Sequence, residues 1–570
     1  MNYNFSRRIQ ILSLCIFAFS LILVSKLFYV QVVHSSDYKE QADRQYATPT
    51  SDIFDRGNIY FSKKDGGLIS AATLVSGFKV AIRPKEITDA EAMYKQIASI
   101  TPLDHDGFIQ KAGKKADPYE EILNHLTKEQ ADALNALDLS GVYVYKEKWR
   151  FYPGETLGSH ALGFVGFKGK DYSGRYGVEK YYNDVLSRAE SNLYVNFFAE
   201  VFSNIKNTIF KGKHEEGDIV TTIEPVVQNY VEKMLAETRE KWSAAKIGAV
   251  VIDPMTGEIY ALASDPGFNL NEYSKAGDAS IYSNPFTENV FELGSIIKPL
   301  TMAAGLDAGV VTPTTTYHDA GFLIIDKKQI NNFDKKGRGT VNMQDVLNQS
   351  LNTGVVFVER KLGKENLRKY FLDFGFNEKT GIDLPNETTG LVSNIMKSNR
   401  EIEYATASFG QGIAVTPLEA TRAFSSLANG GYLITPHVAR EIRYADGGTK
   451  VLEYPPGRQV IKKETSEAIT KMLVTVLDRG YSEGKLKLDH YGVAVKTGTA
   501  QMAKENGGGY YEDKNLHSFF GYFPASQPRF LVMMFIVDPK GVKYSSQTLL
   551  PPFMDTAKFL LNYYEVAPDR

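Results

Sequence analysis

A serine and a lysine three residues apart, Ser295 and Lys298, have the types and spacing that nucleophilic catalysis requires. A serine hydroxyl is a weak nucleophile until a base takes its proton, and a lysine can be that base where its surroundings lower its pKa. If Ser295 caps a helix, both residues share one face and Pro299 falls harmlessly in the first turn. Alone, however, the pattern is common by chance, and a capping serine beside a solvated lysine is the better explanation of it.

Two further segments could complete such a site, namely Ser350 with Asn352 and the run 496–499. Singly, the first is typical of a turn or cap and the second of a strand end with a glycine kink. Together and in this order, the three motifs resemble the penicillin-binding protein and serine β-lactamase superfamily, whose signature is Ser-x-x-Lys, Ser-x-Asn and Lys-Thr-Gly.

The resemblance covers nearly the whole chain and is closest to the class B penicillin-binding proteins, which are monofunctional transpeptidases with a single membrane anchor. Further segments similar to that family are 55–59, 150–153, 159–163, 174–179, 381–385, 408–412 and 416–418. One departure is Ile296, where the family often has a hydroxyl-bearing residue. It leaves the proposed nucleophile and base unchanged.

This resemblance implies a catalytic role for five residues. Ser295 attacks the penultimate D-alanine carbonyl of a stem peptide that ends in D-Ala-D-Ala, while Lys298 takes the serine proton. Ser350 relays a proton to the leaving amine, and Asn352 holds the donor amide and Lys298. Lys496 supplies positive charge. An acceptor amine then displaces the acyl group.

The same resemblance implies a substrate-binding segment at Thr497, Gly498 and Thr499, whose threonines bind the D-alanine carboxylate. The backbone N–H groups of Ser295 and Thr499 would form an oxyanion hole, in which one donor typically contributes about 3 kcal/mol. A strained β-lactam mimics the D-Ala-D-Ala carbonyl and would trap Ser295. No cofactor is expected.

The composition limits other classes of function. The chain has 570 residues and 43% hydrophobic content, enough for two or three folded units. A net charge of -2 gives no reason to expect nucleic acid as a partner. Cys15 is the single cysteine and the nine histidines are scattered, so we expect neither a disulfide nor a metal site.

An apolar segment near the N-terminus predicts a membrane anchor. Residues 9–33 are long enough to span a bilayer, and Arg7 and Arg8 precede them, which places a cytoplasmic tail at 1–8. A cleaved signal peptide would have a shorter apolar region followed by small residues. We therefore expect a single-pass protein of the bacterial cytoplasmic membrane, with its catalytic domain outside.

The remainder predicts a multidomain α/β protein. A mixed α/β pedestal of the penicillin-binding protein dimerisation type is expected at 34–241 and a transpeptidase domain at 242–570. The runs 247–253 and 258–264 predict a hairpin, with further strands at 491–495, 517–523 and 530–537. We expect one mostly antiparallel five-stranded sheet packed against helices; its strand order does not follow from the sequence.

Alternative functions remain open on the sequence alone. A membrane-bound β-lactamase or D,D-carboxypeptidase would share the motifs, but neither needs a long pedestal. A catalytically silent scaffold would not need the intact motifs. A bifunctional synthase would need glycosyltransferase motifs before residue 247, and none is recognised.

The cellular role is likewise an interpretation. The block 517–524 favours a septal, division-type enzyme over an elongation-type one. Expected partners are a polytopic glycan polymerase and other membrane proteins of the division machinery.

Overall fold

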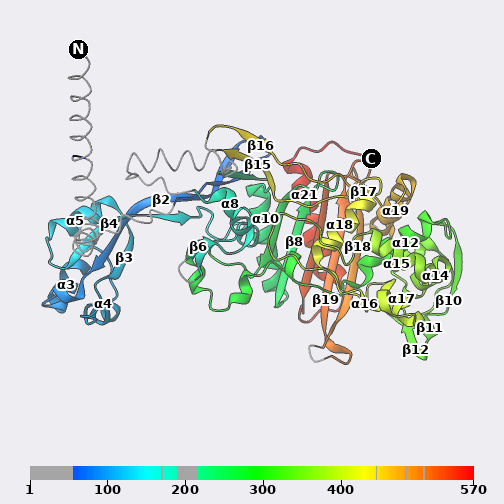
Figure 1. Ribbon diagram of the computed structural model, residues 1–570. Coiled ribbons are helices and arrows are strands. Elements are labelled where there is room, and N and C mark those ends of the chain that lie inside the picture. Colours follow the sequence, from blue (N-terminus) through cyan, green and yellow to red (C-terminus); the bar gives the residue numbers. More distant parts are fainter. Residues whose placement is uncertain are drawn as a thin grey trace, which may run out of the picture. The chain divides into compact units, whose positions relative to one another are not determined.

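The computed structural model describes residues 19, 55–168, 171–188, 216–444, 446–481, 486–504 and 507–570 (Figure 1). These residues form two compact units. The smaller contains residues 55 and 75–149, and the larger contains 56–74 and the described residues from 150 to the C-terminus. The cut between the units falls inside the predicted pedestal, so the domain boundaries at 34, 241 and 242 stay predictions.

The predicted membrane anchor at 9–33 lies outside the described residues, apart from Phe19, and so does the predicted tail at 1–8. Within the described ranges, no helix has both the length and the apolar character that a bilayer crossing needs. The anchor therefore stays a prediction from the sequence.

The smaller unit packs three α-helices against the strands β2, β3 and β4. Its helices begin where a side chain accepts a hydrogen bond from the first turn, at Asp89, Asp104 and Thr127. The second half of β2 pairs with β3, β4 also pairs with β2, and Val80 and Phe108 lie in the buried core. The elements are β2 (Leu68–Ile82), η2 (Pro84–Glu86), α3 (Ala90–Ala98), α4 (His105–Ala112), β3 (Glu120–Leu126), α5 (Lys128–Ala136) and β4 (Val142–Phe151).

A first sheet of the larger unit joins strands that are far apart in the sequence. Its order is β16 (Thr449–Val451), β15 (Ala439–Tyr444), β7 (Gly217–Thr221), β1 (Ile59–Ser62) and the first half of β2. Strand β7 runs parallel to β1 and antiparallel to β15. Segments from the predicted pedestal therefore fold together with a hairpin from the C-terminal half of the chain.

A buried charge network organises three of the N-terminal motifs. The Glu179 carboxylate accepts from Arg56 Nε and from Arg150 Nε, each at 2.6 Å, and from Tyr152 Oη at 3.1 Å. Arg150 also donates to the carbonyl of Gly57 at 2.7 Å. Because both guanidiniums stabilise the ionised form, the pKa of Glu179 lies below its usual value despite complete burial.

The second sheet of the larger unit confirms the predicted five-stranded antiparallel sheet. Its order is β18 (Ala494–Ala503), β19 (Tyr510–Phe523), β20 (Phe530–Val537), β8 (Lys246–Ile252) and β9 (Ile259–Asp265), and every pairing is antiparallel. The strand predicted at 491–495 begins only at Ala494, because the N–H of Gly492 donates to Asp569 Oδ1 and not to a carbonyl of a neighbouring strand.

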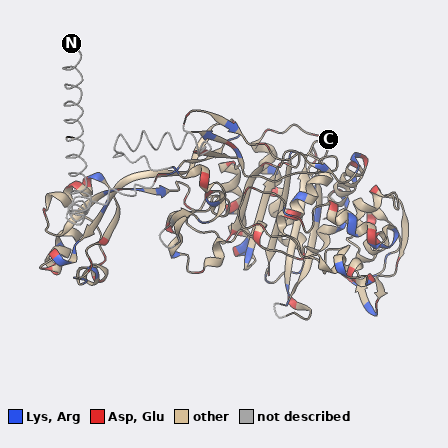
Figure 2. Ribbon diagram, viewed as in Figure 1, with Lys and Arg blue, Asp and Glu red and all other residues tan. Residues whose placement is uncertain are grey.

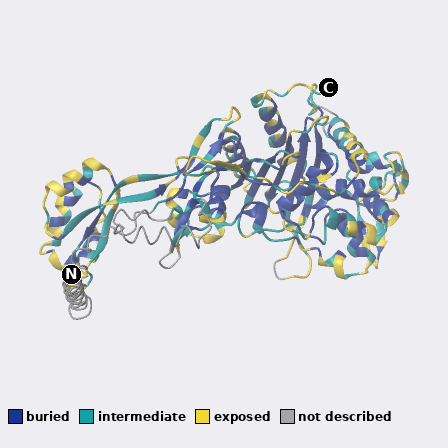
Figure 3. Cartoon of the chain, turned by 45° about the horizontal axis from the view of Figure 1, so that its top comes forward, coloured by how far each residue is buried: buried dark blue, intermediate teal, exposed yellow. Residues whose placement is uncertain are grey.

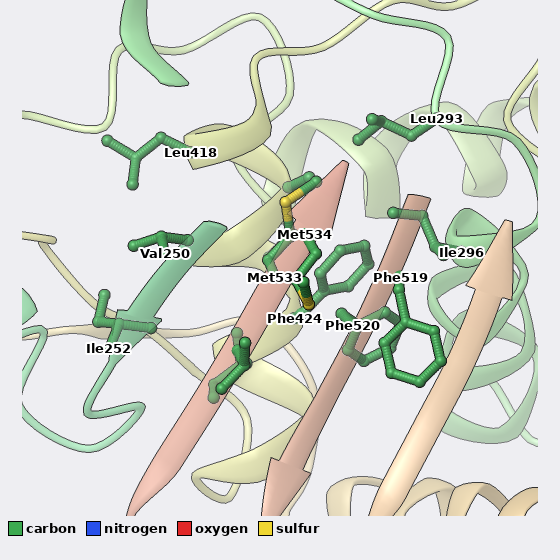
Figure 4. Close-up of a cluster of buried hydrophobic side chains, with 14 of the residues drawn as sticks. Val250, Ile252, Leu293, Ile296, Leu418, Phe424, Phe519, Phe520, Met533 and Met534 are labelled. Atoms are coloured by element: carbon green, nitrogen blue, oxygen red, sulfur yellow. The ribbon is translucent and has the colours of Figure 1, made fainter. Parts of the chain in front are cut away.

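Helices cover both faces of this sheet. Phe519 and Phe520 are neighbours on β19, so they point to opposite faces. The ring of Phe519 lies 4.6 Å from that of Phe553 on α21 (Leu550–Tyr563), whereas Phe520 stacks at 3.9 Å on Phe424 of α18 (Pro417–Ala428). Figure 4 shows part of this apolar cluster, and Figure 3 shows that the strands and their covering helices hold most of the buried residues.

Other elements of the larger unit surround this core. The helices are α6 (Ser159–Leu162), α7 (Gly177–Tyr181), α8 (Asn183–Leu186), α10 (Pro225–Lys241), η3 (Leu270–Lys275), η4 (Ala279–Tyr282), α11 (Pro285–Glu288), α15 (Lys364–Asp373), α16 (Ser393–Lys397), α17 (Glu401–Ala407), α19 (Lys463–Thr475) and η6 (Val476–Gly480). Two short antiparallel pairs are β5 (Val165–Lys168) with β6 (Asp171–Gly174), and β14 (Tyr432–Leu433) with β17 (Arg458–Gln459).

Candidate active site

The proposed nucleophile lies in a short 3-10 turn rather than at a helix cap. Ser295 is the second residue of η5 (Gly294–Ile297), which leads directly into α12 (Lys298–Asp307). The capping expectation is therefore wrong: the residue before α12 is Ile297, and the first-turn position expected for Pro299 is correct. The half-buried Ser295 side chain lines a cleft.

The candidate base Lys298 is fully buried at the start of α12. Its Nζ donates to the carbonyl oxygen of Ser350 at 2.5 Å and to Ser350 Oγ at 3.2 Å. Burial first, and the nearby charge of Lys496 second, hold the pKa of Lys298 well below its usual value. The lysine is thus set to be neutral where an ordinary surface lysine is charged, which a general base requires.

Ser350 occupies the bend between α13 (Met343–Asn348) and α14 (Asn352–Leu362). Its φ of 53° lies in the left-handed region, which turns the chain between the two helices. Asn352 is the first residue of α14, and its Nδ2 donates to the carbonyl of Asn331 at 2.7 Å. Among the described contacts, the Asn352 side chain bonds to this strand carbonyl and not to Lys298.

A buried polar network lies next to Asn352, at the start of α14. Asp319 accepts from Thr353 Oγ1 at 2.7 Å, from Asn332 Nδ2 at 3.0 Å and from the N–H of Arg338 at 3.1 Å. Asp319 ends β10 (Thr316–Asp319), which pairs with β13 (Gly339–Asn342). Asn332 follows β12 (Lys328–Asn331), which pairs with β11 (Phe322–Ile325). Thr353 follows Asn352 directly, so Asp319 fixes the start of α14. No motif pointed to Asp319.

The second lysine reaches the same serine from the sheet. Lys496 lies inside β18, fully buried, and its Nζ lies 3.0 Å from both Ser350 Oγ and the carbonyl of Thr497. Burial lowers the pKa of Lys496 to about 7. Lys298 and Lys496 therefore converge on one hydroxyl, which brings side chains of the three motifs together. The run 496–499 lies within the strand rather than at its end, because the β18 and β19 pairing continues to Ala503 and Tyr510.

The hydroxyls of the predicted substrate-binding segment have partners that no motif indicated. Tyr481 Oη lies 2.8 Å from Thr497 Oγ1. The N–H of Ser545, at the start of α20 (Ser545–Thr548), donates to Thr499 Oγ1 at 3.1 Å. Because Thr499 Oγ1 already accepts a hydrogen bond, its proton is available for a bound carboxylate.

These residues line a cleft of about 1260 Å³. Ser295, Ser350, Asn352, Thr497 and Thr499 open onto it, and its walls also carry Lys328, Arg338, Glu403, Tyr481, Glu512, Lys543 and Tyr544. Figure 2 shows basic and acidic residues interspersed along the ribbon of the larger unit. Within the described ranges, no group of three or more histidine, cysteine or acidic side chains is placed to hold a metal ion.

Two family models match the chain. The penicillin binding protein transpeptidase domain matches residues 247–556, and the penicillin-binding protein dimerisation domain matches residues 55–222. The first alone covers more than half of the 570 residues. A five-stranded antiparallel sheet between helices, with the three motifs at one cleft, is thus the transpeptidase domain of this superfamily.

Individual relatives agree with these matches. The chain is 32% identical over 555 residues to stage V sporulation protein D of Bacillus subtilis, covering 94% of this chain and 82% of that protein. It is 26% identical over 557 residues to a probable peptidoglycan D,D-transpeptidase PenA of Neisseria meningitidis, with 96% and 91% covered. The chain therefore belongs to the class B penicillin-binding proteins, which join a dimerisation domain to a transpeptidase domain.

Solved structures share the fold. Penicillin binding protein 3 of Mycobacterium tuberculosis, in its apo form, matches with a TM-score of 0.66 and 25% identity, covering 74% of this chain and 92% of that one. The ampicillin complex of the same protein matches with a TM-score of 0.69 and 21% identity, covering 91% and 97%.

Proposed function

We propose that this chain is a peptidoglycan D,D-transpeptidase that cross-links stem peptides through an acyl-enzyme on Ser295. The observation that carries the proposal is the convergence of two buried lysines, Lys298 and Lys496, on Ser350 Oγ beside the cleft that Ser295 lines. Burial and the charge of Lys496 hold the pKa of Lys298 well below its usual value, as a base requires, and burial lowers the pKa of Lys496 to about 7.

In the first half-reaction, neutral Lys298 takes the proton from Ser295 Oγ as the oxygen attacks the penultimate D-alanine carbonyl. The carbonyl C–N bond then breaks. The leaving nitrogen keeps the electron pair of that bond and takes the proton through Ser350, and free D-alanine departs. The acyl group is left as an ester on Ser295.

In the second half-reaction, an acceptor amine attacks the ester and gives up one proton. That proton returns to Ser295 Oγ as the C–O bond breaks, which regenerates the serine and forms the new amide. Lys496, Thr497 and Thr499 would bind the D-alanine carboxylate during the first half-reaction.

We also propose that β-lactams inhibit the protein by acylating Ser295. A lactam places its carbonyl where the D-alanine carbonyl would lie, but the broken ring stays attached to the acyl group. Support comes from the neighbouring fold: penicillin binding protein 3 of M. tuberculosis was solved in complexes with aztreonam and with ampicillin.

A septal role, in the division machinery, is the cellular function that we favour. The block 517–524 supports it, and relatives of this chain include peptidoglycan D,D-transpeptidases named FtsI from Buchnera aphidicola. An elongation role is the alternative, since the relatives also include a peptidoglycan D,D-transpeptidase named MrdA from Acinetobacter baumannii.

We further propose that residues 9–33 anchor the protein in the bacterial cytoplasmic membrane. The apolar run and the preceding Arg7 and Arg8 support this topology. The anchor would also contact a polytopic glycan polymerase, because this chain has no recognised glycosyltransferase motifs of its own.

The test is covalent labelling with a fluorescent penicillin followed by a denaturing gel. Wild type should give a stable band that Ser295→Ala abolishes and Lys298→Ala strongly weakens. Ser546→Ala, which removes another serine of the same cleft, should keep the band. No band from folded wild type would refute the transpeptidase and favour a silent scaffold, and a band that fades within minutes would favour a β-lactamase.

A further inference from the structure

The peptide bond just before the nucleophile is held by hydrogen bonds at both of its ends. The carbonyl oxygen of Leu293 accepts from Ser518 Oγ at 2.6 Å, and the N–H of Gly294 donates to the carbonyl of Gly410 at 3.1 Å. These two groups belong to one rigid peptide plane. Its rotation is therefore blocked from two sides, one residue before Ser295.

The space for the Ser518 bond exists because residue 498 is a glycine. A Cβ at Gly498 would overlap Ser518 Oγ and would lie 2.6 Å from the carbonyl oxygen of Leu293. Gly498 and Ser518 are direct partners in the pairing of β18 with β19. The side chain of Ser518 thus crosses over the strand that carries the predicted carboxylate-binding threonines and reaches the turn of the nucleophile.

The bond is sealed from solvent and belongs to a longer linkage. Ser518 and Leu293 are both buried, so water has no access to replace the hydroxyl. The carbonyl of Ser518 accepts from Ser545 Oγ at 2.7 Å, while the N–H of Ser545 donates to Thr499 Oγ1. One chain of hydrogen bonds therefore connects Thr499 to the residue before Gly294.

This linkage joins the two segments that an oxyanion hole must align. Stabilisation of a tetrahedral intermediate requires that both N–H donors lie within hydrogen-bond distance of one oxygen. Ser295 and Thr499 belong to different elements, η5 and β18, so their relative placement depends on contacts between those elements. Gly294 has a φ of 64°, and its Cα joins the Leu293–Gly294 plane to the next plane, which carries the N–H of Ser295.

We propose that Ser518 is a positioning residue for acylation, which fixes the Leu293 and Gly294 peptide plane so that the N–H groups of Ser295 and Thr499 converge on the substrate oxygen. The inference rests on the proposed function of Ser295. Ser518 touches neither substrate nor nucleophile and acts through the carbonyl of Leu293. It lies in the block 517–524, which the proposed chemistry otherwise leaves without a role.

The test compares Ser518→Ala with Ser426→Ala, a matched control. Ser426 is also fully buried and donates its hydroxyl to a backbone carbonyl, that of Ala423, at 2.7 Å, but it lies on α18 away from the cleft. Acylation by a fluorescent penicillin is followed by stopped flow over a range of concentrations. This separates the affinity of the first complex from the rate constant of acylation.

For Ser518→Ala we expect the acylation rate constant to fall at least about tenfold, since small displacements of catalytic groups cost up to about 100-fold. The affinity of the first complex should stay within about twofold and the pH midpoint should not shift, because the carboxylate site and Lys298 are intact. A boronic acid that forms a tetrahedral adduct should also bind more weakly. Ser426→Ala should acylate at the wild-type rate.

An unchanged acylation rate constant in folded Ser518→Ala would overturn the inference and leave the proposed function standing. A loss of active fraction with an unchanged rate constant would do the same, because it would show a role in stability alone. If Ser518→Ala does not fold, Ser518→Cys replaces the hydroxyl with a weaker and somewhat larger donor and should acylate more slowly than wild type; an equal rate would overturn the inference. No acylation of wild type would refute the proposed function itself.

Discussion

The Nζ of Lys298 lies 3.2 Å from Ser350 Oγ, and Lys496 Nζ approaches the same oxygen to 3.0 Å. Two cationic groups in one buried site disfavour double protonation, and burial disfavours each charge. The pKa of Lys298 is lowered by both effects, whereas that of Lys496 is lowered by burial to about 7. The site therefore favours a neutral Lys298 beside a charged Lys496.

The pH dependence of acylation should be bell-shaped. The rate constant should rise as Lys298 loses its proton at its lowered pKa, and should fall as Lys496 loses its charge above a pH of about 7. Fluorescent penicillin labelling across the pH range measures both limbs. A rising limb near the pKa of a solvated lysine would contradict the assignment of Lys298 as the base.

Removing the charge of Lys496 should shift the rising limb of the pH dependence of acylation. In Lys496→Met the like charge beside Lys298 is gone, so the pKa of Lys298 should increase and the rising limb should shift to higher pH. The maximum of the acylation rate constant should also fall, since the carboxylate site loses a cation. An unshifted limb would mean that the two lysines do not interact.

The hydroxyl of Tyr481 should contribute to substrate binding through Thr497. Tyr481→Phe removes the 2.8 Å contact with Thr497 Oγ1 and should weaken the first complex with penicillin about two- to tenfold, as expected for one neutral hydrogen bond. Tyr522→Phe is a matched control, because Tyr522 Oη lies 2.8 Å from Thr470 Oγ1 outside the cleft. Equal effects in both variants would argue against a role for Tyr481 in the site.

Loss of the Asp319 charge should disturb Asn352. Thr353 Oγ1 and the N–H of Arg338 donate to different oxygens of Asp319, and Asp319→Asn replaces one of these oxygens with an amide nitrogen that cannot accept, which should destabilise the protein by about 1–3 kcal/mol. Acylation should also slow, because the start of α14 loses its support. The exposed Asp326, which accepts from the N–H of Ile402 at 3.1 Å, gives the control Asp326→Asn. Urea denaturation and labelling kinetics measure the two effects.

Glu179 should be essential for stability rather than for chemistry. Glu179→Gln leaves the fully buried Arg56 and Arg150 without their shared carboxylate, and should cost about 3–5 kcal/mol. The partly exposed pair of Glu258 with Arg440 is the control, and Glu258→Gln should cost under about 1 kcal/mol. Urea midpoints of both variants are compared. Similar midpoints would contradict the importance of the buried network.

Much of the catalytic domain could be predicted from local patterns. The alternation and apolar runs at 247–264 and 517–537 indicated strands, which form because a buried sheet requires such side chains at successive positions. The three motifs identified Lys298, Ser350 and Lys496 before any geometry was known. Two local predictions were wrong: Ser295 lies in the turn η5 instead of capping α12, and β18 starts late because Gly492 donates to Asp569, which is distant in the sequence.

The sequence by itself determined which residues carry reactive groups and which family they resemble, because type and order are local properties. The lowered pKa of Lys298 depends on burial and on Lys496, nearly two hundred positions away, so only the tertiary structure decided it. The same holds for Tyr481, Asp319 and Ser518. Their side chains belong to no reactive motif, and they matter because folding places one hydroxyl or carboxylate against the backbone or side chain of another segment.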